Sequence, residues 1–419
     1  MDQSKRKLLA AVAGATGAAA LGAGVPAFAQ QTPIRIGTSI AQTGGLGAGG
    51  KASLLAVRIW AEDVNSRGGL LGRRVEIVSY DDQSSPANVP AIYAKLLDID
   101  KVDLLIAPLG TNPNAPLMPI AKQRDLLVMG NFSFDANATI RHDKWFNNAP
   151  WGAGARAWAQ PFLEVGRRLG GKTVAFVAAD GEFQQNLVNG ARVLAKAMGL
   201  QTVYDQSYPP NTTDFSSVVR ALRSARPDIV FISSYPTESV AIVRSVREVG
   251  LGSQAKLVGG GMGGMQFGPL METLGSQLNG FVNFHTFVPE KTMLSPDIRA
   301  FLKRYTQRAA EEKVDPLGFY QPPFNYAIGQ MLEQAVTSTR SLDHKRLADY
   351  IRTNEMKTIV GNFRYDAVGE WADPQLLMIQ FRGLVDRSID QFRQEGRQVI
   401  LAPGRLRSGD PVPFADARK

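Results

Sequence analysis

The stretch from residue 34 to residue 82 constrains the fold more than any other part of the chain. An apolar strand pattern covers 34–40, and apolar residues from Ala52 to Ile59 then recur at the i, i+3, i+4, i+7 spacing of a helix. Gly68 and Gly69 end this helical pattern, and a second strand pattern covers 75–80. Strand–helix–strand units of this kind build parallel sheets with right-handed crossovers. The sequence therefore predicts an α/β fold.

A glycine-rich segment, Gly44 to Gly50, separates the first strand from the helix. Its letters satisfy both G-x-G-x-x-G and, with Lys51, G-x-x-x-x-G-K, two patterns of phosphate-binding loops. However, Ala52 stands where a P-loop needs Ser or Thr, and four residues separate the strand from the first pattern. We therefore expect a flexible loop whose backbone amides meet a small ligand, rather than a nucleotide site.

The N-terminus has the three parts of an export signal. Lys5-Arg6-Lys7 is basic, residues 8–25 are apolar, and Ala27-Phe28-Ala29 is a cleavage site. The segment is short and ends in a cleavage signal, which disfavours a membrane anchor. We predict a signal peptide over 1–29, cleavage after Ala29, and a periplasmic protein. The basic region also resembles a twin-arginine signal with Lys for the first Arg, so the export route stays open.

The absence of cysteine excludes disulfides, thiolate metal sites and thiol nucleophiles. About 390 residues remain after cleavage, a length that suggests two domains or lobes. The net charge is +9, and the signal contributes +2 of it, so the mature chain carries about +7. These charges are spread along the chain, so we expect no nucleic-acid partner and at most a mild preference for anionic ligands.

Two series of alternating strands and helices follow one another. The composition shifts around 147–154, and a second series begins there. Residues 101–106 (KVDLLI) and 226–231 (RPDIVF) occupy matching places in the two series. No short period recurs, so this echo indicates two similar lobes and not a solenoid.

Catalytic and metal-binding patterns are missing from the sequence. The three histidines, His142, His285 and His344, are far apart, and neither H-E-x-x-H nor G-x-S-x-G occurs. The carboxylate pair Asp81-Asp82 ends a strand pattern, where a solvated role is expected. We therefore predict no catalytic residue, no metal site and no cofactor.

The best candidates for a site are loops that follow strands. In open α/β sheets, ligands bind outside the carboxyl ends of the strands. Gly110-Thr111-Asn112 and residues 131–135 follow two strand patterns of the first series, and the second loop carries Phe132 and Phe134. Phe183 and Tyr235 follow strands of the second series. Aromatic residues of this kind are often ordinary core, but facing aromatics from two lobes beside hydroxyl and amide groups suit a binding cleft.

Seven short segments together carry a family resemblance. They are Ile34–Gly37, Thr43-Gly44, Ala61–Asn65 with Gly68-Gly69, Leu71–Glu76, Asp81–Pro86, Tyr208–Pro210 with Thr213–Phe215, and Arg226–Asp228. They resemble the branched-chain amino acid (Leu/Ile/Val) receptor family of type I periplasmic solute-binding proteins, which serve ABC importers. The pattern runs from Ile34 to about Leu401, although its motifs all lie before Ile229.

The resemblance implies a fold, a domain division and partners. The fold would be two Rossmann-like lobes with parallel sheets, joined by three crossovers, with a cleft between them. Lobe 1 would comprise 33–150 and 285–364, lobe 2 would comprise 151–284 and 365–405, and 406–419 would be a surface tail. A small organic solute would close the lobes, and the closed form would dock on an ABC permease of the inner membrane. A monomer is expected.

The resemblance also assigns ligand-binding positions one by one. Thr111 and Asn112 fall on the loop that offers hydroxyl and amide groups to the ligand carboxylate. Ser133 falls on the next loop, where Phe132 and Phe134 replace residues that are usually small. Phe183 replaces a capping Tyr, and a second Tyr falls on Tyr235.

Gly261 falls near the position of the acid that pairs with the ligand ammonium in amino-acid receptors. A buried ammonium without a carboxylate would cost several kcal/mol. The resemblance therefore favours a ligand that lacks the amine: a carboxylate, an aromatic acid or an amide. If the ligand is an amino acid after all, the acid should be sought at Asp180, Glu182 or Glu238.

Three alternatives remain at this point. The protein could be a branched-chain amino acid receptor proper, or a ligand sensor of the same fold. An exported enzyme on a two-lobed α/β fold is the third, and the sequence offers no catalytic constellation for it.

Overall fold

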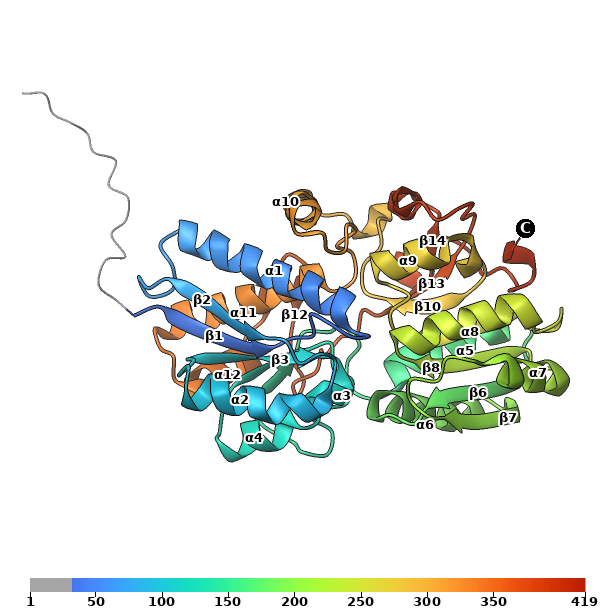
Figure 1. Ribbon diagram of the computed structural model, residues 1–419, viewed down its shortest axis with the longest axis horizontal. Coiled ribbons are helices and arrows are strands. Elements are labelled where there is room, and N and C mark those ends of the chain that lie inside the picture. The colour runs from blue at the N-terminus through green and yellow to red at the C-terminus, as the bar shows by residue number, and fades with distance from the viewer. Residues whose placement is uncertain (1–31, 419) are drawn as a thin grey trace, which may run out of the picture.

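Five parallel strands form the sheet of lobe 1, in the order β2-β1-β3-β4-β5. The computed structural model describes residues 32–418 (Figure 1), so the predicted signal peptide lies outside the described residues. The strands are β1 (Ile34–Ser39), β2 (Val75–Tyr80), β3 (Leu104–Leu109), β4 (Val128–Asn131) and β5 (Trp145–Asn147). The predicted α/β fold and its parallel sheet are confirmed.

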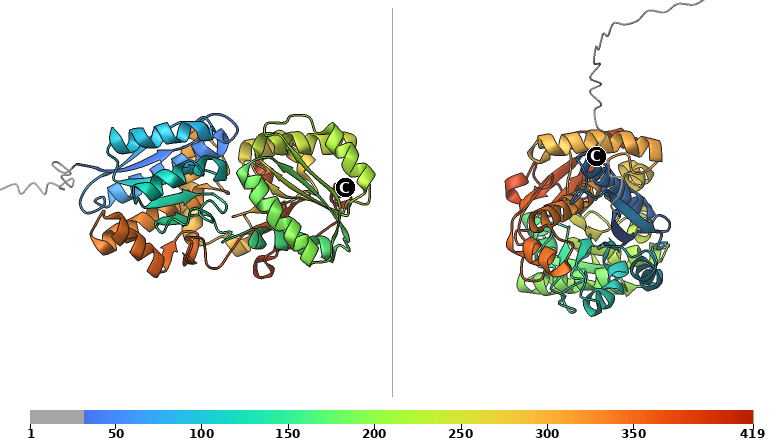
Figure 2. Two further views of the ribbon diagram at one scale, coloured as in Figure 1. Left: turned by 90° about the horizontal axis from the view of Figure 1, so that it is seen from below. Right: turned by 90° about the vertical axis from the view of Figure 1, so that its left-hand side faces the viewer.

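Helices cover both faces of this sheet (Figure 2). Their bounds are α1 (Gly47–Ser66), α2 (Val89–Asp98), α3 (Thr111–Asn114), α4 (Leu117–Gln123), α10 (Pro296–Glu312), α11 (Pro322–Thr339) and α12 (His344–Thr353). Buried residues of α1, α11 and α12 pack on one face of the sheet, and those of α2 and α4 pack on the other. A hairpin of β11 (Met356–Thr358) and β12 (Gly361–Phe363) follows α12.

Helix α1 is buried on two sides, which its sequence pattern did not reveal. The predicted stripe from Ala52 to Ile59 packs against Phe301 and Tyr305 of α10. The residues that face the sheet are instead Leu54, Val57 and Trp60. Because α1 is covered by both the sheet and α10, it is apolar around most of its circumference.

The predicted flexible loop at Gly44–Gly50 is wrong in its second half, because α1 begins at Gly47. A Cβ on Gly50 would lie 1.7 Å from the carbonyl oxygen of Ala41, so only glycine fits this close approach. A Cβ on Gly49 would lie 2.6 Å from both Phe267 and Gln321. The backbone N–H of Gly50 donates to Leu46, so this amide is satisfied within the helix and is not offered to a ligand.

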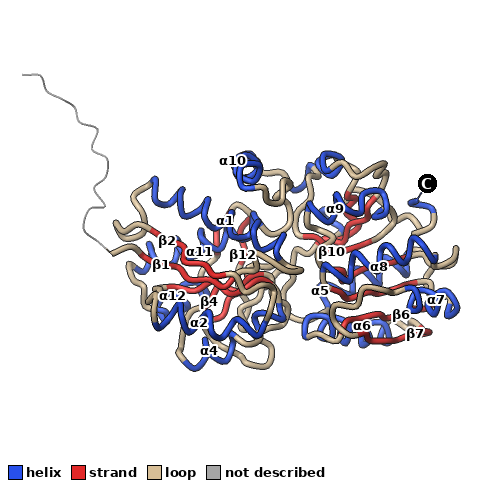
Figure 3. Tube along the Cα trace, viewed as in Figure 1, coloured by secondary structure: helices blue, strands red, loops and turns tan. Residues whose placement is uncertain are grey.

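Lobe 2 contains a seven-stranded sheet in the order β14-β13-β10-β9-β8-β6-β7. Its parallel strands are β6 (Thr173–Ala179), β7 (Gln201–Tyr208), β8 (Ile229–Ser234), β9 (Leu257–Met262) and β10 (Val282–His285), and its antiparallel edge is β13 (Leu377–Phe381) with β14 (Gln398–Ala402). The helices are α5 (Arg156–Arg168), α6 (Glu182–Ala197), α7 (Ser216–Ala225), α8 (Pro236–Val249) and α9 (Gly268–Leu274) (Figure 3). No helix among residues 32–418 is both long and apolar enough to cross a membrane.

The chain passes between the lobes three times, after β5, after β10 and after β12. The expected boundaries at 150/151 and 364/365 fall inside the first and third of these segments, and 284/285 falls at the last residue of β10. The C-terminal segment returns to lobe 2, where buried Phe414 packs edge-on against Phe281 with a centroid distance of 5.1 Å. The three segments that join the lobes are called the crossing segments below.

Candidate functional site

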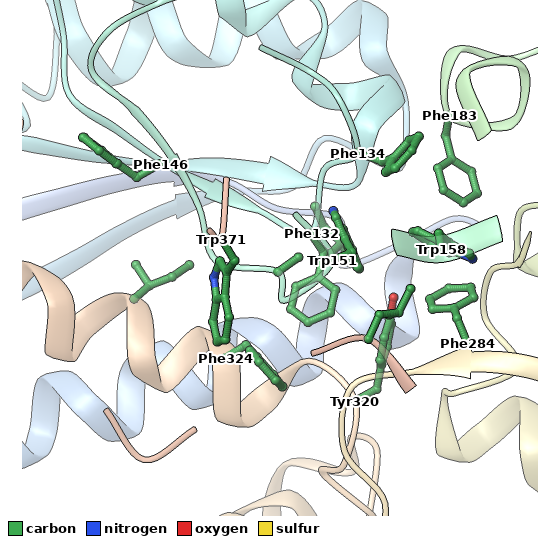
Figure 4. Close-up of a cluster of buried hydrophobic side chains, with 14 of the residues drawn as sticks. Phe132, Phe134, Phe146, Trp151, Trp158, Phe183, Phe284, Tyr320, Phe324 and Trp371 are labelled. Atoms are coloured by element: carbon green, nitrogen blue, oxygen red, sulfur yellow. The ribbon is translucent and has the colours of Figure 1, made fainter. Parts of the chain in front are cut away.

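A cavity of about 40 Å³ lies between the lobes, at the carboxyl ends of strands from both sheets. Lobe 1 contributes the residues that follow β3 and β4, and lobe 2 contributes those that follow β6, β8 and β9. Figure 4 shows a cluster of buried aromatic side chains that includes six of the lining residues: Phe132, Trp151, Trp158, Phe183, Phe284 and Tyr320. We call this the cleft cavity. It lies where open α/β sheets place their ligands, outside the carboxyl strand ends.

The polar part of the cleft cavity comes from the segment after β3. Gly110 has a φ of 87°, which turns the chain sharply from β3 into α3, and Thr111 is the first residue of that helix. The Thr111 hydroxyl accepts a 2.7 Å hydrogen bond from the backbone N–H of Phe134. A hydroxyl has one donor hydrogen and two acceptor lone pairs, so Thr111 can still donate a hydrogen bond to a ligand oxygen.

Phe132 forms the apolar floor of the cavity on the lobe 1 side. It has a φ of 51°, and its backbone N–H donates to the side-chain oxygen of Asn148 at 2.9 Å, which fixes this unusual turn. Its ring meets those of Trp151, Tyr320 and Phe324 edge-on, with centroid distances of 5.4, 4.9 and 5.7 Å. Edge-to-face contacts of this kind are favourable beyond the buried area, so the floor is rigid.

The lobe 2 wall is a stack of two rings. Phe183 lies in the first turn of α6, and its ring stacks on Tyr235 with a centroid distance of 5.4 Å and an interplanar angle of 17°. Trp158 lies beside Phe183 at 5.5 Å. The indole N–H of Trp158 donates to Gly260 and that of Trp151 donates to Ser133, both at 2.9 Å. Both indoles therefore use their polar atoms elsewhere and contribute apolar surface to the cavity.

Four of the eight predicted site residues line the cleft cavity: Thr111, Phe132, Phe183 and Tyr235. Phe183 was expected in a loop, but α6 begins one residue before it. The other four, Asn112, Ser133, Phe134 and Gly261, are placed elsewhere by the structure.

Asn112 lies next to the cavity and connects the lobes. Its side-chain oxygen accepts from the backbone N–H of Phe183 at 2.9 Å, and its own N–H lies 3.4 Å from the Tyr235 hydroxyl. Phe134 is fully buried behind the cavity, in edge-on contact with Trp158. Ser133 is fully buried as well, and its carbonyl accepts from Asn147 and Trp151. These three residues therefore hold the wall and do not face the cavity.

Gly261 was expected at the ligand-binding site, but it does not line the cleft cavity. It lies inside β9, and a Cβ there would come within 2.6 Å of Leu187 and 3.0 Å of the Ile232 carbonyl. The strand reaches the cavity two and three residues later, at Gly263 and Gly264. These positions carry no side chain either, so this strand end supplies no carboxylate to the cavity.

Sequence reasoning missed much of the lining. Gly110, in the predicted loop before Thr111, lines the cavity as well, and the missed residues are Leu46, Leu109, Trp151, Trp158, Pro236, Gly263, Gly264, Phe267, Phe284, Tyr320 and Gln321. Trp151 lies in the first crossing segment, and its place in the NNAPWGAG composition shift was a usable signal. Tyr320 and Gln321 come from far along the chain, and only the second crossing segment brings them here.

No charged side chain lines the cleft cavity. Glu182 directly precedes Phe183 in the chain, and partial burial raises the pKa of its carboxyl above the usual range. Glu238 is buried, and its carboxylate accepts from the backbone N–H of Asn211 at 2.8 Å.

Burial raises the pKa values of the two tyrosines of the lining, Tyr235 and Tyr320, so both hydroxyls stay protonated and can donate hydrogen bonds. Within residues 32–418, no three His, Cys, Asp or Glu side chains group as metal ligands do.

The sequence matches the family model for periplasmic binding proteins over residues 33–377. Among curated proteins, the Leu/Ile/Val-binding protein homolog 7 of Brucella abortus is 26% identical over 369 residues, covering 83% of this chain and 88% of the relative.

Solved structures show the same fold. The branched-chain amino acid transporter substrate-binding protein LivJ of Streptococcus pneumoniae, in complex with isoleucine, has a TM-score of 0.73 at 17% identity, covering 89% of this chain and 100% of that one. A solute-binding protein of an ABC transporter from R. palustris, in complex with benzoate, has a TM-score of 0.71 at 17% identity, covering 88% and 96%.

Proposed function

The chain belongs to the periplasmic binding protein family, and from that premise we propose that it captures a small aromatic or apolar carboxylate without an α-ammonium group. The ligand would bind between the lobes at the place of the cleft cavity. Its present volume of about 40 Å³ is smaller than the roughly 150 Å³ that holds benzene, so the lobes would have to separate to admit the ligand. Thr111 would donate to its carboxylate, and Phe132, Phe183 and Tyr235 would enclose its apolar part.

One observation carries this proposal: the cleft cavity is lined by aromatic rings and hydroxyl groups and contains no carboxylate. An ammonium group buried there would lose its hydration without a paired charge, at a cost of several kcal/mol. A carboxylate can instead be held by hydroxyl groups and by backbone N–H groups at the start of α3. The benzoate complex of the R. palustris relative fits the same ligand class.

The family context extends the proposal to partners and location. The signal pattern at 1–29 would export the chain to the periplasm, and the closed protein would deliver its ligand to an ABC permease. Because the site combines enclosure with hydrogen bonding and no paired acid and base, we propose binding without turnover.

A branched-chain amino acid receptor is the second candidate, and the Leu/Ile/Val-binding relatives favour it. The ammonium would then need an acid that now lies outside the cavity lining. Glu182 is the best placed, because it directly precedes Phe183 and has no ion-pair partner among residues 32–418; its side chain is exposed to solvent. The two candidates are distinguished by whether binding requires the amine.

The test is a binding screen on residues 30–419, unfolded and refolded to remove any carried ligand. The panel contains benzoate, hydroxybenzoates, aliphatic acids, amides and the branched-chain amino acids. A ligand at about a hundred times its dissociation constant adds roughly 2.7 kcal/mol of stability, which a thermal shift detects. We expect hits among acids without an amine. A response to branched-chain amino acids alone would contradict the proposed ligand class.

Variants then locate the site. Phe183→Ala and Tyr235→Ala each remove a wall of the cleft cavity and should weaken binding by tenfold or more, since burying an aromatic side chain contributes a few kcal/mol. The control is Val193→Ala, an exposed residue of α6 on the same lobe. Unchanged affinity in both aromatic variants would show that the ligand binds elsewhere.

A further inference from the structure

A second, larger cavity lies among the crossing segments. Its volume is about 290 Å³. Pro150 lines it from the first crossing segment, Thr286 and Phe287 from the second, and Trp371 and Gln375 from the third. We call it the hinge cavity, because every connection about which the lobes can move contributes to its wall.

The hinge cavity is distinct from the cleft cavity and shares a wall with it. The two have no lining residue in common. Phe324 lines the hinge cavity, and its ring lies 5.7 Å from that of Phe132, which lines the cleft cavity. The Thr286 hydroxyl donates at 2.7 Å to the carbonyl of Tyr320, another cleft residue. The two cavities are therefore separated by a single layer of side chains.

The lining defines a ligand chemistry. A cavity of roughly 150 Å³ lined by apolar side chains holds benzene, so 290 Å³ has room for a two-ring molecule. Phe287, Ile298 and Val360 supply apolar walls. Asp297, in the first turn of α10, is the charged residue of the lining; it is exposed to solvent, and its carboxylate has no ion-pair partner in the described chain.

We propose that the hinge cavity binds a two-ring aromatic amine, with its rings against the apolar walls and its ammonium toward Asp297. The charge requirement is opposite to that of the cleft cavity, whose lining contains no carboxylate. This inference goes beyond the proposed function and does not depend on which solute the cleft binds.

Occupation of the hinge cavity biases lobe closure. The cavity has its present shape in the form where Asn112 of lobe 1 contacts Phe183 of lobe 2. Because all three crossing segments line the cavity, a rotation of the lobes about them would change that shape. A ligand that fits one form better than the other shifts the population toward that form. A hinge ligand therefore favours the closed arrangement of the lobes.

The first test is binding of tryptamine, with indole-3-acetate as the matched anion, measured by calorimetry on the refolded protein. We expect tryptamine to bind more tightly than indole-3-acetate. Asp297→Asn should abolish that preference, and Val360→Trp, which fills the cavity, should weaken tryptamine at least tenfold. Phe183→Ala should leave tryptamine binding intact. If Phe183→Ala removes binding and the two hinge variants do not, the amine sits in the cleft and the hinge site is disproved.

The second test measures closure directly. The chain has no cysteine, and Ile99 of lobe 1 and Val193 of lobe 2 are 72% and 70% exposed. Spin labels on Ile99→Cys/Val193→Cys report the distance between the lobes. Tryptamine should shift the distance distribution toward its shortest component, and Val360→Trp should remove that response. An unchanged distribution at saturating tryptamine would overturn the coupling, whatever the cleft binds.

Discussion

The side-chain oxygen of Asn112 in lobe 1 accepts a 2.9 Å hydrogen bond from the backbone N–H of Phe183 in lobe 2. The ring of Phe183 in turn stacks on Tyr235, whose hydroxyl lies 3.4 Å from the backbone nitrogen of Asn112. These contacts join the lobes directly at the edge of the cleft cavity. Asn112, which joins the lobes, therefore contacts two residues that line the cleft cavity, Phe183 and Tyr235.

Asn112→Ala should shift the protein toward the open form. A hydrogen bond of this kind contributes about 1 kcal/mol net, so its loss should lower the closed-to-open ratio about fivefold. The Ile99→Cys/Val193→Cys label pair measures the change as a longer mean distance between the lobes. Asn112→Asp is the matched control, because it keeps the acceptor oxygen. Equal distance distributions for the Ala variant and the parent would contradict the role of Asn112 in closure.

Glu182→Gln should separate the two candidate ligand classes. Glu182 directly precedes Phe183 and its side chain reaches solvent, while partial burial of its carboxyl raises the pKa. If the ligand is an aromatic carboxylate, the substitution removes a nearby acid and should leave affinity unchanged or slightly improved. If the ligand is an amino acid, the loss of an ammonium partner should cost at least tenfold in affinity. Titration of benzoate and leucine into both proteins decides between them, and loss of leucine binding would contradict the proposed function.

Gly50→Ala should destabilise the protein, although Gly→Ala inside a helix usually stabilises it by about 0.5–1 kcal/mol. The added Cβ would lie 1.7 Å from the carbonyl oxygen of Ala41, so α1 or the end of β1 must move. We expect a loss of about 2 kcal/mol or more in urea unfolding, comparable to overpacking a core. Gly404→Ala is the control, because nothing lies within 4 Å of its Cβ position. A stabilised Gly50→Ala variant would show that the close packing is not essential.

The order of strands and helices could be predicted from the sequence because it follows local periodicity. Buried strands such as β3 and β8 read as continuous apolar runs, as expected for parallel strands covered on both faces. The predicted ends of the helices and strands were less accurate than their order. Gly47 to Gly50 looked like a loop because glycine disfavours helices, yet tertiary packing against Ala41 and Phe267 selects glycine inside α1.

The candidate site was predictable only where it follows a strand directly. Thr111, Phe132 and Tyr235 occupy such places, and all three line the cleft cavity. Trp158 and Tyr320 could not be found in this way, because one belongs to a helix face and the other arrives through the second crossing segment. Gly261 was misplaced because β9 continues through the glycines that seemed to end it, which moves the strand end to Gly263.

His285 should make the stability of the protein fall at acidic pH. It is fully buried at the end of β10, and burial lowers the pKa of its imidazole from 6.5 to about 3. Its Nδ1 accepts from the backbone N–H groups of Thr286 and Phe287 at 3.0 and 3.2 Å, so the ring is held neutral at the start of the second crossing segment.

Between pH 6.5 and pH 3, the unfolded chain binds a proton at His285 that the folded chain does not, so stability is present above pH 6.5 and declines below it. At pH 5 the loss should be about 2 kcal/mol, since one pKa unit corresponds to about 1.4 kcal/mol. His285→Asn keeps an acceptor near the Nδ1 position and cannot be protonated, so its stability should fall less from pH 7 to pH 5. Urea unfolding of both proteins at the two pH values measures the difference. Because every other titrating group is common to both, equal losses would mean that His285 is not responsible for the acid sensitivity.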